Sequence, residues 1–489
     1  MTLHVRWVAA ATLFTLLAAV PAVQAQDSQK GMMQADTNGP AAISYKGITI
    51  APVGYFAGEA VFRSRNETAD MGSSFNAIPF GNTTNGKLTE FRGSAKQSRL
   101  GLLVKANPGD VKITGYFESD FLSAGASSNS VESNSYTLRM RQFFGQAAFD
   151  NGFTISSGQM WSLLTLNKHG AENLTQGTPP TIDAQYVPGF DWARQWGIRV
   201  AQTFADRQAT IALSAEEPQM TVGGHGAPAQ TFIGNVGGSQ LSSIANYSTD
   251  VAPDVILKLA VDPKGIGHFE IKGIGRVFRD RVVDPACTLG CSKTAVREGA
   301  GVGVGAFVPI VPHYLDLTLE GLWGTGIGRY GTSMLPDVVV RPNGIIAPVL
   351  AAHAMGGLDI HATHKLDIYL YGGVEYAYRT IYQTAAATGT KPATYIGYGS
   401  PTANNNACDT EAVPTSEYVP GPVTCSADTK AVWQFTPGFW YKFYSGKGGT
   451  FQWGMQYSYT TRNTWSGLGG YSPLAIDQMA FTSIRYYFP

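Results

Sequence analysis

The sequence predicts an all-β protein: a transmembrane antiparallel β-barrel of 16 strands, with short periplasmic turns and long extracellular loops. Three features predict it: a two-residue alternation of apolar and polar side chains, a strict alternation of tight turns with long loops, and the composition. Of 489 residues, 57 are glycine, 11% are aromatic and only 14% are charged. Short, glycine-punctuated strands with aromatic residues favour one barrel over several globular domains.

The alternation is clearest between residues 110 and 149. In DVKITGYFESDF, Ile113 and Phe117 share one parity, and Glu118 and Asp120 share the other. Such a strand has one apolar face and one hydrated face. The later segment YTLRMRQFFGQAAF repeats the pattern with two arginines on the polar side, which predicts a hairpin with apolar residues toward lipid and polar residues toward a lumen. The apolar parity of the second strand comprises Tyr136, Leu138, Met140 and Phe144.

Sixteen segments carry strand signals, and tight turns alternate with long loops between them. An even number of strands lets an antiparallel sheet close with both termini on the same side. Short turns at one end and long loops at the other are typical of outer-membrane barrels. The predicted strands are 48–64, 89–105, 110–122, 136–149, 152–161, 195–204, 208–216, 252–261, 267–280, 296–309, 313–327, 350–362, 365–381, 431–444, 449–463 and 476–488.

The beginning of the chain is typical of a cleaved secretory signal peptide. It has a basic start with Arg6, an apolar run from about Trp7 to Val20, and a small-x-small site ending at Ala25. An uncleaved anchor is the alternative, but the run is shorter than the roughly 20 residues that span a bilayer. We therefore expect export to the bacterial outer membrane. The expected parts are a signal peptide at 1–25, a flexible periplasmic lead-in at 26–46, and the barrel at 47–489.

The net charge excludes one class of partner. The whole chain has 35 basic and 35 acidic residues, and cleavage after Ala25 removes only Arg6, leaving 34 basic and 35 acidic residues. A near-neutral protein has no bulk attraction for nucleic acid, so any charge selectivity must be local.

The four cysteines form two pairs that are local in sequence, Cys287 with Cys291 and Cys408 with Cys425. Both pairs fall in predicted loops of an exported chain, where the compartment is oxidising, so we expect two loop-closing disulfides. The spacing of the first pair could instead suggest a metal site, but no histidine or third cysteine stands nearby. No metal or obligatory cofactor is expected.

The outward face of the first five strands is less apolar than that of the others. Polar groups facing hydrocarbon are costly unless they are paired, so we expect a subunit interface there, most simply in a homotrimer. The alternative is an error of parity, because a slip of one residue exchanges the faces. The outward row would include Gly54, Gly58, Ala60, Ser119, Gln142, Gln146, Ser157 and Gln159.

The segment EGAGVGVGAF places Gly299, Gly301, Gly303 and Gly305 on one parity. Glycines in a strand often mark the close approach of other atoms. Either an infolded loop lies against this strip, or the glycines keep the lumen wide.

The candidate constriction is the loop 162–194, which follows the fifth strand. It is long and mixes apolar and aromatic residues with charged ones, including Lys168, Asp183 and Asp191. A purely solvated loop would have fewer apolar side chains, so we expect this loop to fold into the barrel; a surface loop is the alternative.

Basic residues of polar parity would face this loop and favour anions, because a guanidinium presents a fixed fork of donors that suits carboxylates, sulfonates and phosphates. A structural role is the alternative, since Glu118 and Asp120 could pair with arginines across the hairpin. The predicted pore-lining cations are Arg99, Arg139, Arg141, Arg199, Lys258, Arg276 and Arg379.

Four segments resemble the DcaP-like outer-membrane porins, a family of trimeric sixteen-stranded channels for dicarboxylate uptake: FRGSAKQSRLGLLV, GYFESDF, NSYTLRMRQFFGQ and SSGQMWSLL. They cover about the first third of the chain after the signal; beyond it only strand count and loop rhythm agree. The resemblance implies passive uptake of small anionic solutes through an arginine-lined constriction, with Arg99, Arg139 and Arg141 at matching positions. The lead-in lacks the heptads of the N-terminal coiled coil found in some members.

The sequence therefore predicts a porin in the lipid bilayer that passes small, preferentially anionic organic solutes such as carboxylates, and no enzymatic activity. Catalytic motifs such as G-x-S-x-G, a P-loop and H-E-x-x-H are missing from the sequence. Two alternatives remain: a barrel enzyme that hydrolyses lipids or esters, and a non-conducting structural or adhesive barrel.

Overall fold

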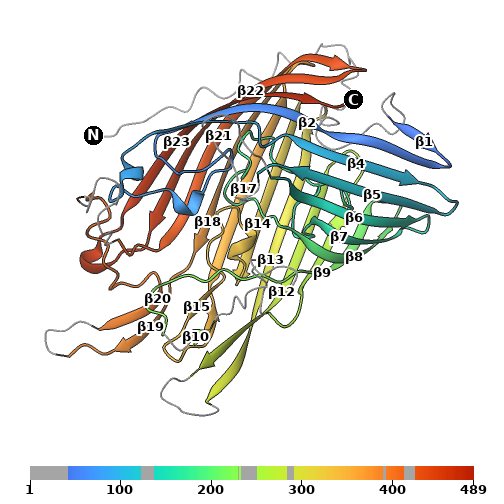
Figure 1. Cartoon of the computed structure of the whole chain (residues 1–489). Helices are drawn as coiled ribbons and strands as arrows, with labels where there is room; N and C mark the ends of the chain where they lie inside the picture. The colour runs from blue at the N-terminus through green and yellow to red at the C-terminus, as the bar shows by residue number, and fades with distance from the viewer. Residues whose placement is uncertain are drawn as a thin grey trace, which may run out of the picture.

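The computed structural model describes residues 42–122, 137–228, 231–232, 250–283, 291–388, 393–411, 413 and 425–489. One antiparallel sheet closes on itself into a barrel (Figure 1). The sheet has 19 strands, but β1 and β10 are short additions and β3 with β4 are two segments of one strand, so the wall has sixteen strands as predicted. The wall consists of β2 (Ile48–Arg63), β3 (Glu90–Ser94) with β4 (Arg99–Ala106), β5 (Val111–Asp120), β6 (Arg139–Phe149), β7 (Phe153–Trp161), β8 (Arg194–Phe204), β9 (Ala209–Glu216), β11 (Asp254–Val261), β12 (His268–Val283), β13 (Ser292–Val311), β14 (Leu315–Thr325), β17 (Leu350–His361), β18 (Leu366–Ala377), β21 (Thr429–Gly446), β22 (Gly449–Thr464) and β23 (Leu474–Tyr487).

The first and last strands close the barrel. Residues 55–63 of β2 pair with residues 479–487 of β23, while the other edge of β2 pairs with β4 and β3. Closure leaves no exposed sheet edge in the wall, as a β-structure in a bilayer requires. The predicted second strand, 89–105, is interrupted between Ser94 and Arg99, which the periodicity did not reveal.

Long loops lie at one end of the barrel and tight turns at the other (Figure 1). Within the described residues the loops contain two small hairpins and four single-turn 3-10 helices, and none of the helices is long and apolar enough to cross a membrane. The short additional strands are β1 (Ile43–Tyr45), β10 (Thr231–Phe232), β15 (Val338–Val340), β16 (Ile346–Pro348), β19 (Thr380–Ala385) and β20 (Thr394–Tyr398), and the helices are η1 (Phe75–Ala77), η2 (Thr84–Gly86), η3 (Gly328–Tyr330) and η4 (Leu468–Gly470).

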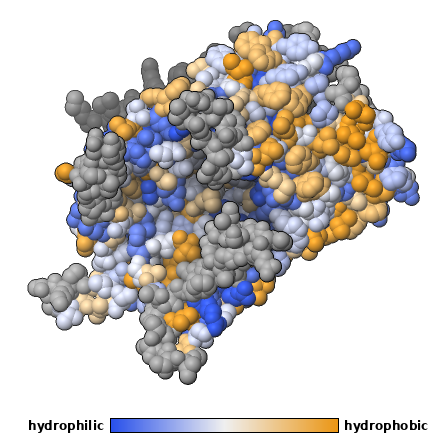
Figure 2. All heavy atoms as spheres, viewed as in Figure 1, coloured by the Kyte–Doolittle hydropathy of each residue, from blue (hydrophilic) through white to orange (hydrophobic). Residues whose placement is uncertain are grey.

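The two faces of the wall have the predicted opposite character. On β11, Val255, Leu257 and Leu259 are 43–47% exposed, whereas the alternating Lys258 is fully buried inside the barrel. Figure 2 shows hydrophobic side chains gathered on the outer surface over β4–β8. An apolar exterior around a charged interior is the arrangement of a transmembrane barrel.

A β-bulge in β6 corrects the predicted parity of that strand. Glu118 is opposite Gln142 and Ser119 is opposite Met140, so Arg141 has no partner in β5 and the faces exchange there. Phe144, predicted to face outward, packs inside against Tyr116 at a centroid distance of 5.7 Å. A bulge adds one residue to one strand and shifts every later residue by one position, which periodicity alone does not show.

The same bulge moves two glutamines out of the predicted outward row. Gln142 shares the inward face of Glu118, and Gln146 accepts a hydrogen bond at 3.2 Å from Asn173 of the lumen loop. Gln159, opposite the exposed Phe143, does face outward and donates to the Met140 carbonyl at 2.7 Å.

Cys408 and Cys425 form a disulfide with a Cα–Cα distance of 4.7 Å. The disulfide lies within the loop before β21 and packs against Ile78 and Phe80 of the loop after β2. Cys287 lies outside the described residues, as do the signal peptide and all but the last five residues of the lead-in; the Cys287–Cys291 pair stays a prediction.

Candidate functional site

The loop 162–193 crosses the interior of the barrel. Ile182, Val187 and Phe190 are fully buried against aromatic side chains from the opposite wall, among them Tyr369 of β18 and Trp440 of β21. These side chains hold the loop through the hydrophobic effect, since each fully buried apolar side chain contributes roughly 1.5–3 kcal/mol. The loop therefore divides the lumen.

Charged side chains of the wall fix the backbone of this loop. Lys258 Nζ donates to the Thr165 carbonyl at 2.8 Å, and Lys272 Nζ donates to the Leu164 carbonyl at 2.6 Å. Arg199 donates to the Ala171 carbonyl of the loop at 3.2 Å, and also to the carbonyl of Trp161, the last residue of β7, at 2.6 Å. The predicted pore-lining residues Arg199 and Lys258 are 3% and 0% exposed, so their donors serve the loop.

Carboxylates of the wall accept hydrogen bonds from the backbone amides of the same loop. Glu216 accepts from the Leu163 amide at 2.7 Å, and Glu375 accepts from the Gly189 amide at 2.9 Å. Buried backbone groups without water need such partners, because an unsatisfied one costs about 1–3 kcal/mol. The wall from β8 to β18 is thus lined with anchors for the loop, which we call the anchor wall.

A second loop, 326–349, also packs inside the mouth, which the sequence pattern did not predict. Ile327, Tyr330 and Leu335 are fully buried, and the Trp192 amide donates to the Tyr330 carbonyl at 2.8 Å. Arg276 holds this second loop through an ion pair with Asp337 at 2.8 Å. Arg276, which the sequence predicted to line the pore, is 1% exposed and makes this anchoring contact.

Arginines of β4 and β6 meet two acids of β5 on the other side of the lumen. Arg139 binds both oxygens of Asp120, at 2.9 and 2.7 Å. Arg141 pairs with Glu118 and lies 2.8 Å from Asp120, and Arg99 lies 3.9 Å from Glu118. Glu118 and Asp120 therefore do pair with arginines across the hairpin, which was the structural alternative in the sequence analysis. These ion pairs do not occupy all the N–H donors of the arginines.

Arg194, at the start of β8, adds a positive charge that has no acid partner among the residues that the structure describes. Its guanidinium lies 4.9 Å from the ring centroids of both Trp161 and Trp192, a cation–π contact on two sides. Nη1 of Arg194 and Nε of Arg99 are buried and have no hydrogen-bond partner in the described part of the chain. Arg99, Arg141 and Arg194 all lie close enough to act electrostatically on Tyr186 of the loop.

We call Arg99, Arg139, Arg141 and Arg194 the arginine cluster. Glu118 and Asp120 offset two of its four charges, which leaves an excess of two positive charges. The side chains of Arg139 and Arg99 remain 37% and 15% exposed, unlike the cations of the anchor wall. This is the part of the lumen where a small anion could meet unpartnered donors.

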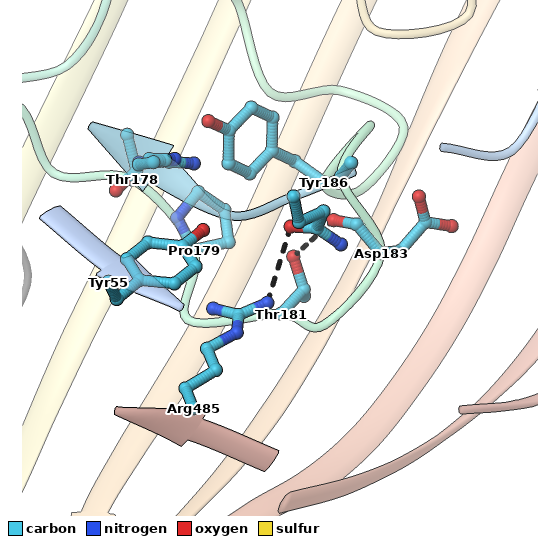
Figure 3. A pocket seen from close by; sticks show the side chains of 10 residues that line it. Tyr55, Thr178, Pro179, Thr181, Asp183, Tyr186 and Arg485 are labelled. Carbon is cyan, nitrogen blue, oxygen red and sulfur yellow. Dashed lines mark hydrogen bonds between the residues drawn. The ribbon is translucent and has the colours of Figure 1, made fainter. Parts of the chain in front are cut away.

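A narrow cavity of about 20 Å³ lies beside the cluster, lined by Arg99, Tyr55, Gln97, Arg485 and loop residues 178–186. Arg485 of β23 donates to Gln97 at 3.3 Å. In Figure 3 the carboxylate of Asp183 points away from the Arg485 guanidinium. Arg485 is neutralised by Glu59 at 2.9 Å. A volume near that of one water sphere leaves this cavity room for about one water molecule.

The remaining predicted site residues are Asp183, which lines the cavity beside the cluster, and Lys168, Asp191 and Arg379. Asp183 accepts from the Ser73 amide at 3.1 Å, and Asp191 pairs with His353 at 2.6 Å; both acids are buried. Lys168 lies 5.1 Å from the Phe307 ring. Arg379 lies at the rim, where it stacks on Trp465 and donates to the Ser466 carbonyl.

The glycine strip of β13 lies under the infolded loops. A Cβ on Gly305 would stand 2.6 Å from Leu166 Cδ1, and one on Gly301 would stand 2.9 Å from Ile327. Of the two explanations the sequence allowed, close approach of a loop is the one that the structure shows.

Sequence reasoning missed Arg194 and Arg485. Arg485 shares the parity of Ser483 and Tyr487 in the last strand, so the alternation there could have identified it. Arg194 has the parity of the outward residues Trp196 and Ile198, which are 48% and 43% exposed, and it turns inward only at the end of the strand. Within the described ranges, no three His, Cys, Asp or Glu side chains gather as metal ligands.

Comparison with known proteins supports the architecture through structure alone. No protein-family description and no curated protein sequence matches the chain. The outer membrane channel DcaP of Acinetobacter baumannii is 16% identical, with a TM-score of 0.61 over 92% of this chain and 100% of that one. The anion-selective porin from Comamonas acidovorans (9% identity; 90% and 100% covered) and the Salmonella typhi OmpF complex with daunomycin (11%; 91% and 100%) both have TM-scores of 0.46. The chain thus has the sixteen-stranded barrel fold of the DcaP channel.

Proposed function

We propose that this protein is a porin of the bacterial outer membrane, through which small hydrophilic solutes, preferentially anionic organic ones such as carboxylates, diffuse passively. The arginine cluster carries the proposal: four guanidinium groups with two acids, partly exposed, beside an infolded loop that narrows the lumen. A pore selects by its width and by the charges at its narrowest point.

The outward surface supports the location in a bilayer. A charged lumen within an apolar exterior fits a transmembrane barrel, and the long loops would face the outside of the cell. Export would use the signal peptide at residues 1–25, with the lead-in on the periplasmic side.

The protein assembles as a homotrimer in this proposal. The outward face of β2 carries Gly54, Gly58 and Ala60, and that of β7 carries Ser157. Small residues leave a surface that a second barrel can approach closely. Native mass spectrometry of the detergent-extracted protein tests this, and a purely monomeric species would contradict it.

Planar-bilayer conductance in a salt gradient tests the channel. We expect anion-selective reversal potentials and closure in three steps under voltage. The double variant Arg99→Gln/Arg139→Gln removes two positive charges, which equals the excess charge of the cluster. Its reversal potential should therefore move close to zero, as in a channel without charge selectivity.

The matched control Arg207→Gln/Lys264→Gln changes the total charge equally, but at exposed residues in tight turns. It should keep the wild-type reversal potential. A silent bilayer would reject the channel, and unchanged selectivity in the double variant would reject the role of the cluster.

A further inference from the structure

The outer wall of the barrel has a hollow at its loop end that no part of the channel proposal uses. It measures about 390 Å³ and is lined by Tyr376, Lys430, Ala431, Asn463, Thr464, Ser472 and Pro473. We propose that this hollow binds the phosphorylated headgroup of a lipid in the outer leaflet. The proposal rests on the bilayer location given above, and not on conduction or selectivity.

The strand register shows that the hollow faces away from the lumen. Tyr376 of β18 is opposite Ala431 of β21, and Ala431 is opposite Asn463 of β22, so the three residues form one row across the wall. Their neighbours Glu375 and Val432 are fully buried inside the barrel. Successive residues of a strand point to opposite faces, which places the row on the outer surface.

The shape of the hollow follows from the small residue in the middle of the row. Ala431 forms the floor between the larger Tyr376 and Asn463. The loop after β22 forms the roof, where the Thr464 hydroxyl donates to the Pro473 carbonyl at 2.8 Å and Ser472 bonds to the Thr464 carbonyl. The roof is therefore tied to the wall and defines a site of fixed width.

A β-bulge brings a lysine to this site. Thr429 pairs with Thr464 and Ala431 pairs with Asn463, so Lys430 is the extra residue of β21. Bulges commonly redirect a side chain. Lys430 Nζ lies 5.0 Å from the Trp465 ring, and among the described residues no carboxylate lies within ion-pair distance of it.

The local charge is positive. Arg379 stacks on the same Trp465 ring at 4.7 Å, and its buried Nε has no hydrogen-bond partner. None of the residues that line the hollow is acidic. Lys430 would offer a phosphate a positive charge, and the second N–H of the Asn463 amide, whose first N–H donates to Thr461 Oγ1 at 3.0 Å, would offer a neutral hydrogen-bond donor.

The hollow lies at the level in the membrane where a lipid headgroup is expected. The Trp433–Tyr459 pair, 5.5 Å apart, lies one step nearer the middle of the wall, followed by Phe435, which is 48% exposed. Aromatic girdles mark the bilayer interfaces of such barrels, with the headgroups beside them. Acyl chains would then lie along the exposed apolar residues below, and the phosphate would reach Lys430.

Native mass spectrometry of the full-length protein, with lipid A carrying both phosphates, tests the site. We expect wild type to retain the lipid and Lys430→Gln to retain about fivefold less, the effect of one lysine at a membrane surface. Lys430→Arg should keep binding. Ala431→Phe fills the floor without changing the charge and should also lose binding.

The matched control is Lys447→Gln, at the tight turn of the same β21–β22 hairpin. It should bind like wild type. Equal retention by Lys430→Gln, equal retention of dephosphorylated lipid A, or full competition by inorganic phosphate would overturn the proposal. Conductance of the same samples separates this outcome from failure of the channel proposal, because Lys430→Gln should conduct as wild type does.

Discussion

The two walls of the lumen use the same kinds of charged residue for different purposes. On the anchor wall, Lys258 and Lys272 are at most 1% exposed, and their ammonium groups bond to loop carbonyls and to acids. In the arginine cluster, Arg139 keeps 37% of its side chain exposed, and Arg194 has no acid partner within the described ranges. The difference lies in which groups of the loop 162–193 face each wall: backbone groups on one side and side chains on the other.

Backbone contacts decide which cations are free. The first turn of the loop lies against β9, β11 and β12, so its carbonyls and amides use the nearest lysines and glutamates. Opposite the cluster the loop presents the side chains of Tyr186 and Trp192 instead. A charged side chain that points into a barrel therefore indicates a pore-lining role only where its donors are not hydrogen-bonded to the loop backbone.

The strongest test removes an anchor. Lys272→Met leaves Glu270 and Glu320, which lie 3.2 and 2.6 Å from the ammonium, as buried acids without that partner. Breaking a buried ion pair from one side costs about 3–5 kcal/mol. We expect that loss in the free energy of unfolding, measured by urea titration with tryptophan fluorescence, together with noisier single-channel currents as the loop loosens.

Arg139→Gln is the matched variant on the other wall. Asp120 is buried but keeps Arg141 as a partner at 2.8 Å, and Arg139 itself is 37% exposed, so the loss should be smaller than in Lys272→Met, about 1 kcal/mol. Equal losses in the two variants would mean that the walls do not differ as described.

The second test concerns the space between wall and loop. Gly305→Ala places a methyl group 2.6 Å from Leu166 and 2.9 Å from Glu270 Cγ. Overpacking of a buried site costs about 1–3 kcal/mol, so we expect a loss of that size in the same titration.

Gly273→Ala is the control, because nothing lies within 4 Å of its added Cβ. It should be neutral or slightly stabilising, since alanine restricts the unfolded chain. If Gly305→Ala were equally neutral, the loop would not press on the strip.

The sequence was sufficient to predict the barrel because the alternation recurs in several wall strands and tight turns alternate with long loops between them. It predicted the charged parity of Glu118, Asp120 and Arg139 for the same reason. It failed at Phe144 and Gln146, because a bulge shifts the parity without changing the composition.

The role of each lumen cation could not be predicted either. Lys258 and Arg139 both have inward parity in a strand, and only the three-dimensional path of the loop separates an anchor from an accessible charge. The same holds for the loop 326–349, whose burial depends on contacts with Trp192 and Arg276 from distant parts of the chain.

The smallest effect belongs to an exposed contact between two loops at the mouth. His225 lies 3.2 Å from Asp428 with half of its side chain exposed, and its carbonyl accepts from the Gly397 amide. The hydrogen bond to Asp428 raises the pKa of His225 above its usual value of about 6.5. The folded state therefore favours the protonated ring, and the stabilisation is complete below about pH 6.5 and is lost as the pH rises through the raised pKa.

We expect the ratio of observed to intrinsic hydrogen-exchange rate at the Gly397 amide to be higher at pH 9 than at pH 5.5. In His225→Gln this ratio should not depend on pH. A pH-independent ratio in wild type would show that this exposed pair adds nothing, in contrast to the buried anchors below it.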